Sequence, residues 1–219
     1  MNARFDADKL RDLAEELAVA NHFSIAGKRT AIDVVTIRKS LAGRTRLRFD
    51  KVALGFVAQL RQALQALVPD GQMLIVTVTA PIRQDSKTAA ALEEKLRTRL
   101  ARQSARVSMH ETIHGNRIQV RLIKGVPAGA AKLIGFVHNP ETDADALLGF
   151  VQTFIGQIGA AAERTTRKPM GPRCLVVVDG NTPARAGTVR HVLCQLGSPG
   201  GFEAMVLVDA QGRVESLGR

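Results

Sequence analysis

Apolar residues recur along the chain with two spacings that predict strands alternating with helices. Near-continuous apolar runs, typical of strands covered on both faces, occur at Met73–Val78 and Cys174–Asp179. Each run precedes a segment with helical apolar spacing, at Ser86–Arg102 and Pro183–Leu196. Because strand and helix patterns alternate, we expect an α/β protein with mixed sheets.

The expected elements follow the same order in both halves of the chain. The tetrapeptide at Leu54–Val57 recurs at Leu148–Val151, each time within a helical pattern. A β-branched stretch precedes each helix, at Ala31–Ile37 and Lys132–Val137, and a hairpin pattern closes each half. The hairpins pair 105–113 with 116–123 around His114-Gly115, and 203–209 with 213–217 around Gln211-Gly212. We therefore expect two similar βαβαββ halves produced by an internal duplication.

Three segments are expected along the chain. An acidic amphipathic helix occupies residues 1–24, a basic α/β half spans 25–125, and a near-neutral α/β half spans 126–219. The acidic, interrupted pattern of the first segment is unlike a secretory signal. The longest uncharged stretch, 146–162, is shorter than the roughly 20 residues of a membrane span, so it predicts a buried helix. We expect no membrane partner.

Composition places the chain among ordinary globular proteins. Hydrophobic residues make up 45% of the sequence and charged residues 23%. The two cysteines, Cys174 and Cys194, are too few for a disulfide framework or a four-cysteine zinc site. Both are expected to be packing residues in a cytoplasmic protein that holds no cofactor.

Positive charge is the most informative bulk property. The chain has 31 Lys and Arg against 20 Asp and Glu, a net charge of +11. All of this excess lies within residues 21–132, and a field concentrated on one region attracts polyanions. Arginine side chains suit phosphate, because each guanidinium can bind two of its oxygens. The candidate contacts are Arg44, Arg46, Arg48, Arg97, Arg99, Arg102, Arg106, Arg117, Arg121 and Lys124.

These features predict non-catalytic binding of a polyanion, with duplex nucleic acid as the first choice. The chain contains no Trp or Tyr, whereas proteins that bind single strands without sequence preference stack bases on aromatic side chains. Backbone contacts to a duplex are therefore favoured over base stacking. The near-neutral second half would then serve as scaffold or as the surface of a homodimer. Alternatively, the charge reflects only coding composition, and the chain is a protein-interaction subunit.

A zinc-dependent hydrolase is a sharper alternative. His110, Glu111 and His114 satisfy the pattern H-E-x-x-H, which on a helix places two zinc ligands on one face beside a general base. However, the alternation around Met109 and Ile113 is that of a strand. In a strand the two histidines would lie about 13 Å apart and could not share a metal ion. The hypothesis therefore depends on a helix at this position.

A small-molecule site at strand ends is a second enzymatic alternative. Asp179, Asn181 and Thr182 follow a buried strand and open a helix, and His138 and Asn139 hold a similar position earlier in the chain. Ligands of open α/β sheets commonly bind at the carboxyl ends of strands. Ordinary helix capping explains the same residue types without any ligand.

Overall fold

The computed structural model describes most of the chain as two compact units. The described residues are 24–25, 28–29, 31–37, 45–101, 108–166, 172–179, 183–197, 199–209 and 211–216. The five-stranded unit comprises Leu41–Val126 and Ala131–Thr153, and the four-stranded unit comprises Met1–Ser40, Pro127–Ala130 and Phe154–Arg219. Each unit is described by itself.

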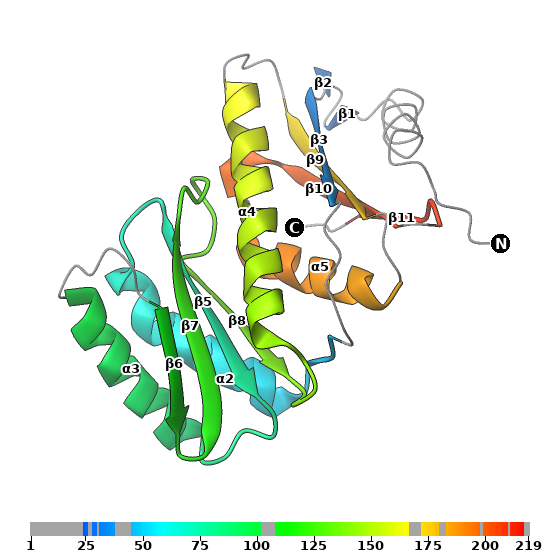
Figure 1. Cartoon of the computed structure of the whole chain (residues 1–219). Coiled ribbons are helices and arrows are strands. Elements are labelled where there is room, and N and C mark those ends of the chain that lie inside the picture. The colour runs from blue at the N-terminus through cyan, green and yellow to red at the C-terminus, as the bar shows by residue number, and fades with distance from the viewer. Residues whose placement is uncertain are drawn as a thin grey trace. The chain divides into compact units, whose positions relative to one another are not determined.

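The five-stranded unit contains one mixed sheet with the order β4-β8-β5-β7-β6 (Figure 1). Its elements are β4 (Leu47–Arg48), α2 (Lys51–Leu64), η1 (Gln65–Leu67), β5 (Gln72–Thr79), α3 (Asp85–Ala101), β6 (Ser108–Ile113), β7 (Asn116–Lys124), β8 (Leu133–His138) and the first turns of α4 (Ala144–Thr166). Strand β5 runs parallel to β8 and antiparallel to β7. Strands β4 and β6 therefore form the two edges of this sheet.

Helices α2 and α3 cover one face of this sheet and form its main core. Alternate residues of β5 and β7 pack there against leucines of both helices. Helix α2 begins after Asp50, whose Oδ1 accepts a hydrogen bond from the Ala53 backbone at 3.0 Å. Gly135 of β8 lets α2 approach closely, because a Cβ there would lie 2.7 Å from Cγ2 of Val57. The first turns of α4 lie across the sheet from α2 and α3 (Figure 1).

A tight turn joins β6 to β7, as the sequence predicted. Its two residues, His114 and Gly115, have φ values of 49° and 79°, and positive φ at both central residues is what a type I′ hairpin turn requires. Asn116 then anchors the hairpin: its Oδ1 accepts from the Arg83 backbone at 2.7 Å, and its Nδ2 lies 2.9 Å from Oγ1 of Thr88. The hairpin is thereby tied to the start of α3.

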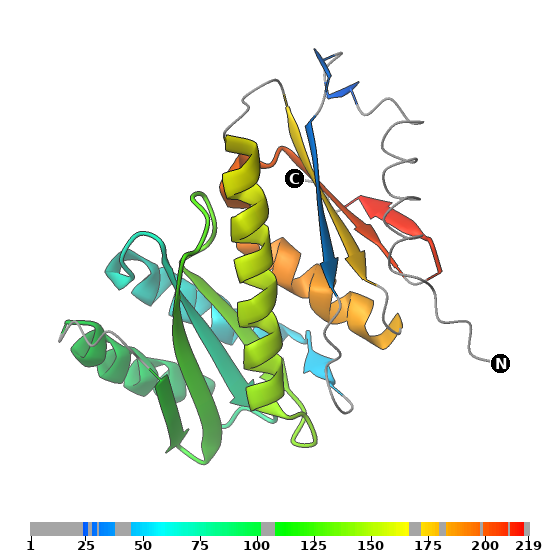
Figure 2. The same cartoon turned by 45° about the horizontal axis from the view of Figure 1, so that its top comes forward.

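The four-stranded unit contains a sheet with the order β11-β10-β9-β3 (Figure 2). Its elements are β3 (Ala31–Ile37), the last turns of α4, β9 (Arg173–Asp179), α5 (Pro183–Leu196), η2 (Pro199–Gly201), β10 (Ala204–Val208) and β11 (Val214–Ser216). Strands β3, β9 and β10 are parallel, and β11 closes the predicted second hairpin. Two short strands, β1 (Ser24–Ile25) and β2 (Lys28–Arg29), form a separate ribbon.

Arg173 is a structural cation of the four-stranded unit. Its guanidinium donates to the carbonyls of Gly200 at 2.6 Å and Ala162 at 3.1 Å, and lies 4.5 Å from the centre of the Phe202 ring. A carboxylate oxygen of Asp33 on β3 is 3.8 Å away. These contacts join the end of α4, η2 and the β3 edge, so Arg173 holds the unit together.

The α/β class is confirmed, but the strands are not divided between the units as the predicted halves would divide them. Strand β3, from the first half, pairs with β9, whereas β8, from the second half, pairs with β5. The two compact units therefore do not coincide with 25–125 and 126–219. The predicted helix within 1–24 lies outside the described residues, and the internal duplication stays a prediction. No helix in the described ranges has the length and apolar character needed to cross a membrane.

Candidate functional site

The β6–β7 hairpin presents one polar face, which we call the open face. It comprises the alternate residues that point away from α2 and α3, and their cross-strand pairs are Ser108–Arg121, His110–Gln119 and Thr112–Arg117. The three β6 residues and Arg117 are exposed, while Gln119 and Arg121 are half-buried. The opposite residues of the hairpin belong to the core, so strand alternation alone determines which side chains are displayed.

Glu111 is a charged residue on the core side of the hairpin, where alternation places it between Met109 and Ile113. The structure supplies the reason. Its carboxylate is bound by Lys95 and by Arg99 Nη2, the latter at 2.9 Å, and both cations project from α3. The Lys95 hydrogen bond is the largest cause that lowers the pKa of Glu111 below its usual value, and Arg99 adds to it. The carboxylate is therefore fully paired at neutral pH.

Several candidate cations are held by carboxylates rather than offered to a ligand. Arg48 binds Asp50 at 3.0 Å, and Arg97 binds Glu93 one helical turn away at 2.7 Å. Arg99 is held by the Glu111 carboxylate described above. These three guanidinium groups contribute little free positive charge, because each has a carboxylate neighbour within ion-pair distance.

The remaining candidates do not gather on one surface. Arg46 adjoins β4, at the sheet edge opposite β6, and its backbone holds the start of α4 through Thr142 Oγ1 at 3.1 Å. Lys124 ends β7 on the side of the core residues, and α3 lies across the sheet from the open face. Arg44, Arg102 and Arg106 lie outside the described residues. The candidate contacts that the structure describes therefore lie on several parts of the unit.

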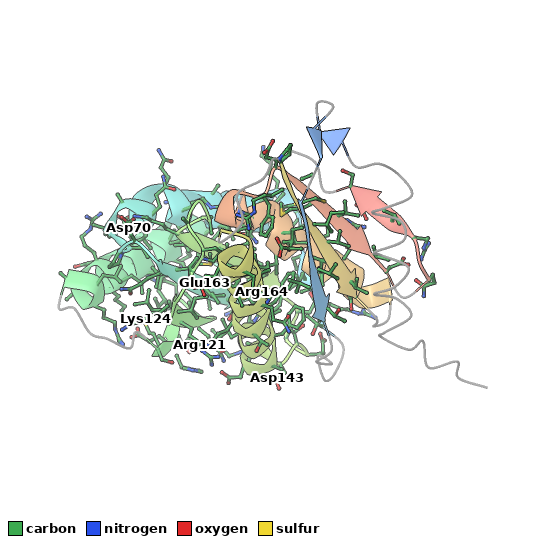
Figure 3. All side chains as sticks on the ribbon, turned by 90° about the horizontal axis from the view of Figure 1, so that it is seen from above. Asp70, Arg121, Lys124, Asp143, Glu163 and Arg164 are labelled. Atoms are coloured by element: carbon green, nitrogen blue, oxygen red, sulfur yellow. The ribbon has the colours of Figure 1, made fainter. Side chains whose placement is uncertain are left out.

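Arg117 and Arg121 are the described candidates that lie on the open face. Arg121 (Figure 3) lies 3.5 Å from Oδ1 of Asp145 and 3.4 Å from Oε1 of Gln152, both on α4. Arg117 is exposed and forms no ion pair with any residue that the structure describes. It lies close enough to His138 to lower the pKa of that histidine, although burial is the larger cause. Arg117 is thus the accessible cation of the open face.

The helical zinc motif is not formed. Helix α3 ends at Ala101, and His110 lies in strand β6 while His114 lies in the following turn. Alternation and the turn place the two imidazoles apart, so the geometry that H-E-x-x-H requires is absent. No cluster of three or more His, Cys, Asp or Glu with metal-binding geometry occurs among the described residues.

Two of the proposed strand-end residues, His138 and Asp179, are buried and belong to different units, while Asn139 is half-buried. His138, in the five-stranded unit, is only 2% exposed, and its Nδ1 lies 2.9 Å from the carbonyl oxygen of Asn139. Asp179, in the four-stranded unit, is also 2% exposed. Asn181 and Thr182 lie outside the described residues. A small-molecule site at these positions stays a prediction.

Two features of the open face were missed by sequence reasoning. Asp145 and Gln152 border it from α4, 24 and 31 positions along the chain from their partner Arg121, and no local pattern indicates such a contact. Below them, Thr77 and Gln119 are register partners on β5 and β7. Thr77 Oγ1 and Gln119 Oε1 are buried and lack a hydrogen-bond partner among the described residues.

Comparison with protein-family models, with curated proteins and with solved structures finds no match for this chain. The chemistry of the open face is therefore the basis for assigning a function.

Proposed function

We propose that the open face binds the phosphate backbone of a nucleic acid, with a duplex as the preferred form, and that it catalyses no reaction. The main support is that Arg117 is an exposed cation with no carboxylate partner among the described residues. Ser108, Thr112 and Gln119 on the same face are polar and uncharged, and such side chains donate hydrogen bonds to phosphate oxygens.

The spacing of the two arginines favours a duplex. Arg117 and Arg121 lie four residues apart on one strand, a separation of about 13 Å along β7. The major groove of B-DNA is about 12 Å wide, so the two guanidinium groups can reach phosphates on opposite sides of it. The open face contains no aromatic ring other than imidazole, so its residue types favour phosphate contacts over base stacking.

Binding of a mixed-sequence DNA duplex, measured by fluorescence anisotropy between about 50 and about 200 mM salt, tests the proposal. Each phosphate contact adds about 0.9 to the slope of log affinity against log salt. We expect Arg117→Gln to weaken binding and to reduce this slope by about one contact. Arg97→Gln is the matched control, because it removes the same charge from α3 while Arg97 is already bound to Glu93.

Two outcomes would contradict the proposal. One is that the unmodified protein does not bind the duplex at low salt. The other is that Arg117→Gln and Arg97→Gln reduce the slope equally, which would show that only the net charge of the protein matters. Circular dichroism of each variant shows whether the fold is retained.

We further infer that the two halves derive from a duplication and that binding is confined to the first half. The support is the shared order of elements, α2-β5-α3-β6-β7 and α4-β9-α5-β10-β11. Superposition of α2-β5-α3 on α4-β9-α5 in an experimental structure tests the duplication. The proposal keeps the cytoplasmic location expected from the low cysteine content, a compartment in which nucleic acids are present.

A further inference from the structure

A carboxylate of the protein itself faces Arg121 and His110 on the open face. Oδ1 of Asp145 lies 3.5 Å from Nη2 of Arg121 and 4.0 Å from Nε2 of His110. Asp145 belongs to the first turn of α4, whose beginning is stabilised by Asp143 Oδ1, which accepts from the Ala146 backbone at 3.0 Å (Figure 3). One negatively charged oxygen thus faces both polar side chains of the hairpin.

Both distances are longer than those of a hydrogen-bonded ion pair. Direct hydrogen bonds between charged nitrogen and oxygen groups are about 2.7–2.9 Å, shorter than both distances to Asp145. The Asp145 side chain is 59% exposed, so water can replace Arg121 as its partner at little cost. Arg121 is only 28% exposed, so its neighbours limit its movement when Asp145 turns away.

We propose that Arg121 and His110 form a phosphodiester subsite and that Asp145 competes with the nucleic acid for it. A phosphodiester has two non-bridging oxygens that share one negative charge. One oxygen can accept from Arg121 while the other faces His110, whereas a single carboxylate oxygen faces both groups at present. This inference rests on the proposed function and adds an element of control, because Asp145 sets how tightly the open face binds.

The surroundings of His110 are consistent with this role. Its cross-strand neighbour is the uncharged Gln119, Arg121 lies on the same face two residues further along β7, and Asp145 approaches from α4. Asp145 is therefore the acidic group within ion-pair distance of His110 among the described residues. When its charge is removed, both His110 and Arg121 become available to a phosphate.

The test compares Asp145→Asn with Asp70→Asn in the full chain. Both substitutions remove one negative charge from the five-stranded unit. Asp70 binds Lys132 at 2.7 Å in the turn before β5, away from the hairpin, and its side chain is 97% exposed. We expect Asp145→Asn to tighten binding of a DNA duplex about fivefold, the effect of removing one competing surface contact. Asp70→Asn should change the affinity much less.

Further variants locate the effect. Asp145→Glu retains the charge and should bind as the unmodified protein does. Arg121→Gln should abolish the gain produced by Asp145→Asn, because the subsite then lacks its cation. Duplex DNA and duplex RNA are measured in parallel: a gain with both indicates a subsite for phosphate alone, and a gain with one identifies the nucleic acid that fits. Circular dichroism confirms that α4 is retained in each variant.

The possible failures are distinguishable. If the unmodified protein binds and Arg117→Gln weakens it, but Asp145→Asn gains no more than Asp70→Asn, the competition is refuted and the proposed function stands. A gain that persists in the Arg121→Gln background also refutes the subsite. If neither the unmodified protein nor Asp145→Asn binds either duplex, both proposals fail.

Discussion

Replacing Asn116 with alanine should strongly destabilise the hairpin that presents the open face. The Asn116 side chain is 1% exposed, and four partners lie within hydrogen-bond distance of its amide. Oδ1 accepts from the Arg83 backbone at 2.7 Å, and Nδ2 lies 2.8 Å from the Arg83 carbonyl, 2.9 Å from Thr88 Oγ1 and 3.0 Å from the Ile113 carbonyl. Alanine removes all four contacts at once.

The expected loss of stability depends on which partners of Asn116 keep another hydrogen bond when the side chain is removed. The Arg83 carbonyl keeps the hydrogen bond from Thr88 Oγ1 at 2.9 Å, so it is not left without a donor. The Arg83 N–H loses its acceptor, which costs about 1–3 kcal/mol, and each other lost hydrogen bond costs about 1 kcal/mol. The Asn116 Nδ2 has two hydrogens, so two donated hydrogen bonds are lost in addition to the one that Oδ1 accepts. We therefore expect Asn116→Ala to lower the free energy of unfolding by about 3–5 kcal/mol.

Gln119→Met is the matched control on the same strand. Gln119 Oε1 has no hydrogen-bond partner among the described residues, so methionine should change stability by less than about 1 kcal/mol. Urea unfolding is followed by circular dichroism, because the chain has no Trp or Tyr to report by fluorescence. Hydrogen exchange of peptides from β7 resolves the loss within the five-stranded unit. Equal losses for the two variants would refute the importance of the Asn116 contacts.

Three further predictions concern packing, thiol chemistry and pH. Gly135→Ala should destabilise the five-stranded unit by about 1–3 kcal/mol in urea unfolding, because its Cβ would meet Val57 at 2.7 Å; an unchanged midpoint would show that α2 shifts freely. A thiol reagent at pH 8 should modify the exposed Cys194 but not Cys174, whose burial raises its pKa to about 11; modification of two thiols in the native protein would contradict this, and Cys194→Ser is the control. Glu111→Gln should cost about 1 kcal/mol at pH 7, and the difference should disappear as the pH falls below the usual pKa range of a glutamate. Because the ion pairs lower the pKa of Glu111 in the folded protein, they stabilise the fold at a pH above the pKa that Glu111 has in the unfolded chain. This stabilisation is lost when the carboxylate is protonated. A stability difference that does not depend on pH would refute the ion pairs with α3.

The open face itself was largely predictable from sequence. Alternation along β6 and β7 correctly assigned Met109 and Ile118 to the core and His110 and Arg117 to the other side. The pairing of Arg97 with Glu93 was not predicted, although the two residues have the i, i+4 spacing of helical ion pairs. The pairing of Glu111 with α3 was not visible, because it depends on how the helix crosses the hairpin.

The sequence by itself determined the order and type of the described α-helices and of the strands other than the two-residue strands β1, β2 and β4. It also determined the two hairpins and the buried side of β6 and β7. These are local properties, since side-chain alternation and helical spacing act within a few residues. Only the tertiary structure decided that β3 pairs with β9 and β8 with β5. The apolar sequence of a strand covered on both faces does not indicate which strand it will pair with. It also decided that Asp145 faces Arg121, because an ion pair depends on which elements become neighbours, and residues distant in the chain meet only after the sheet has formed.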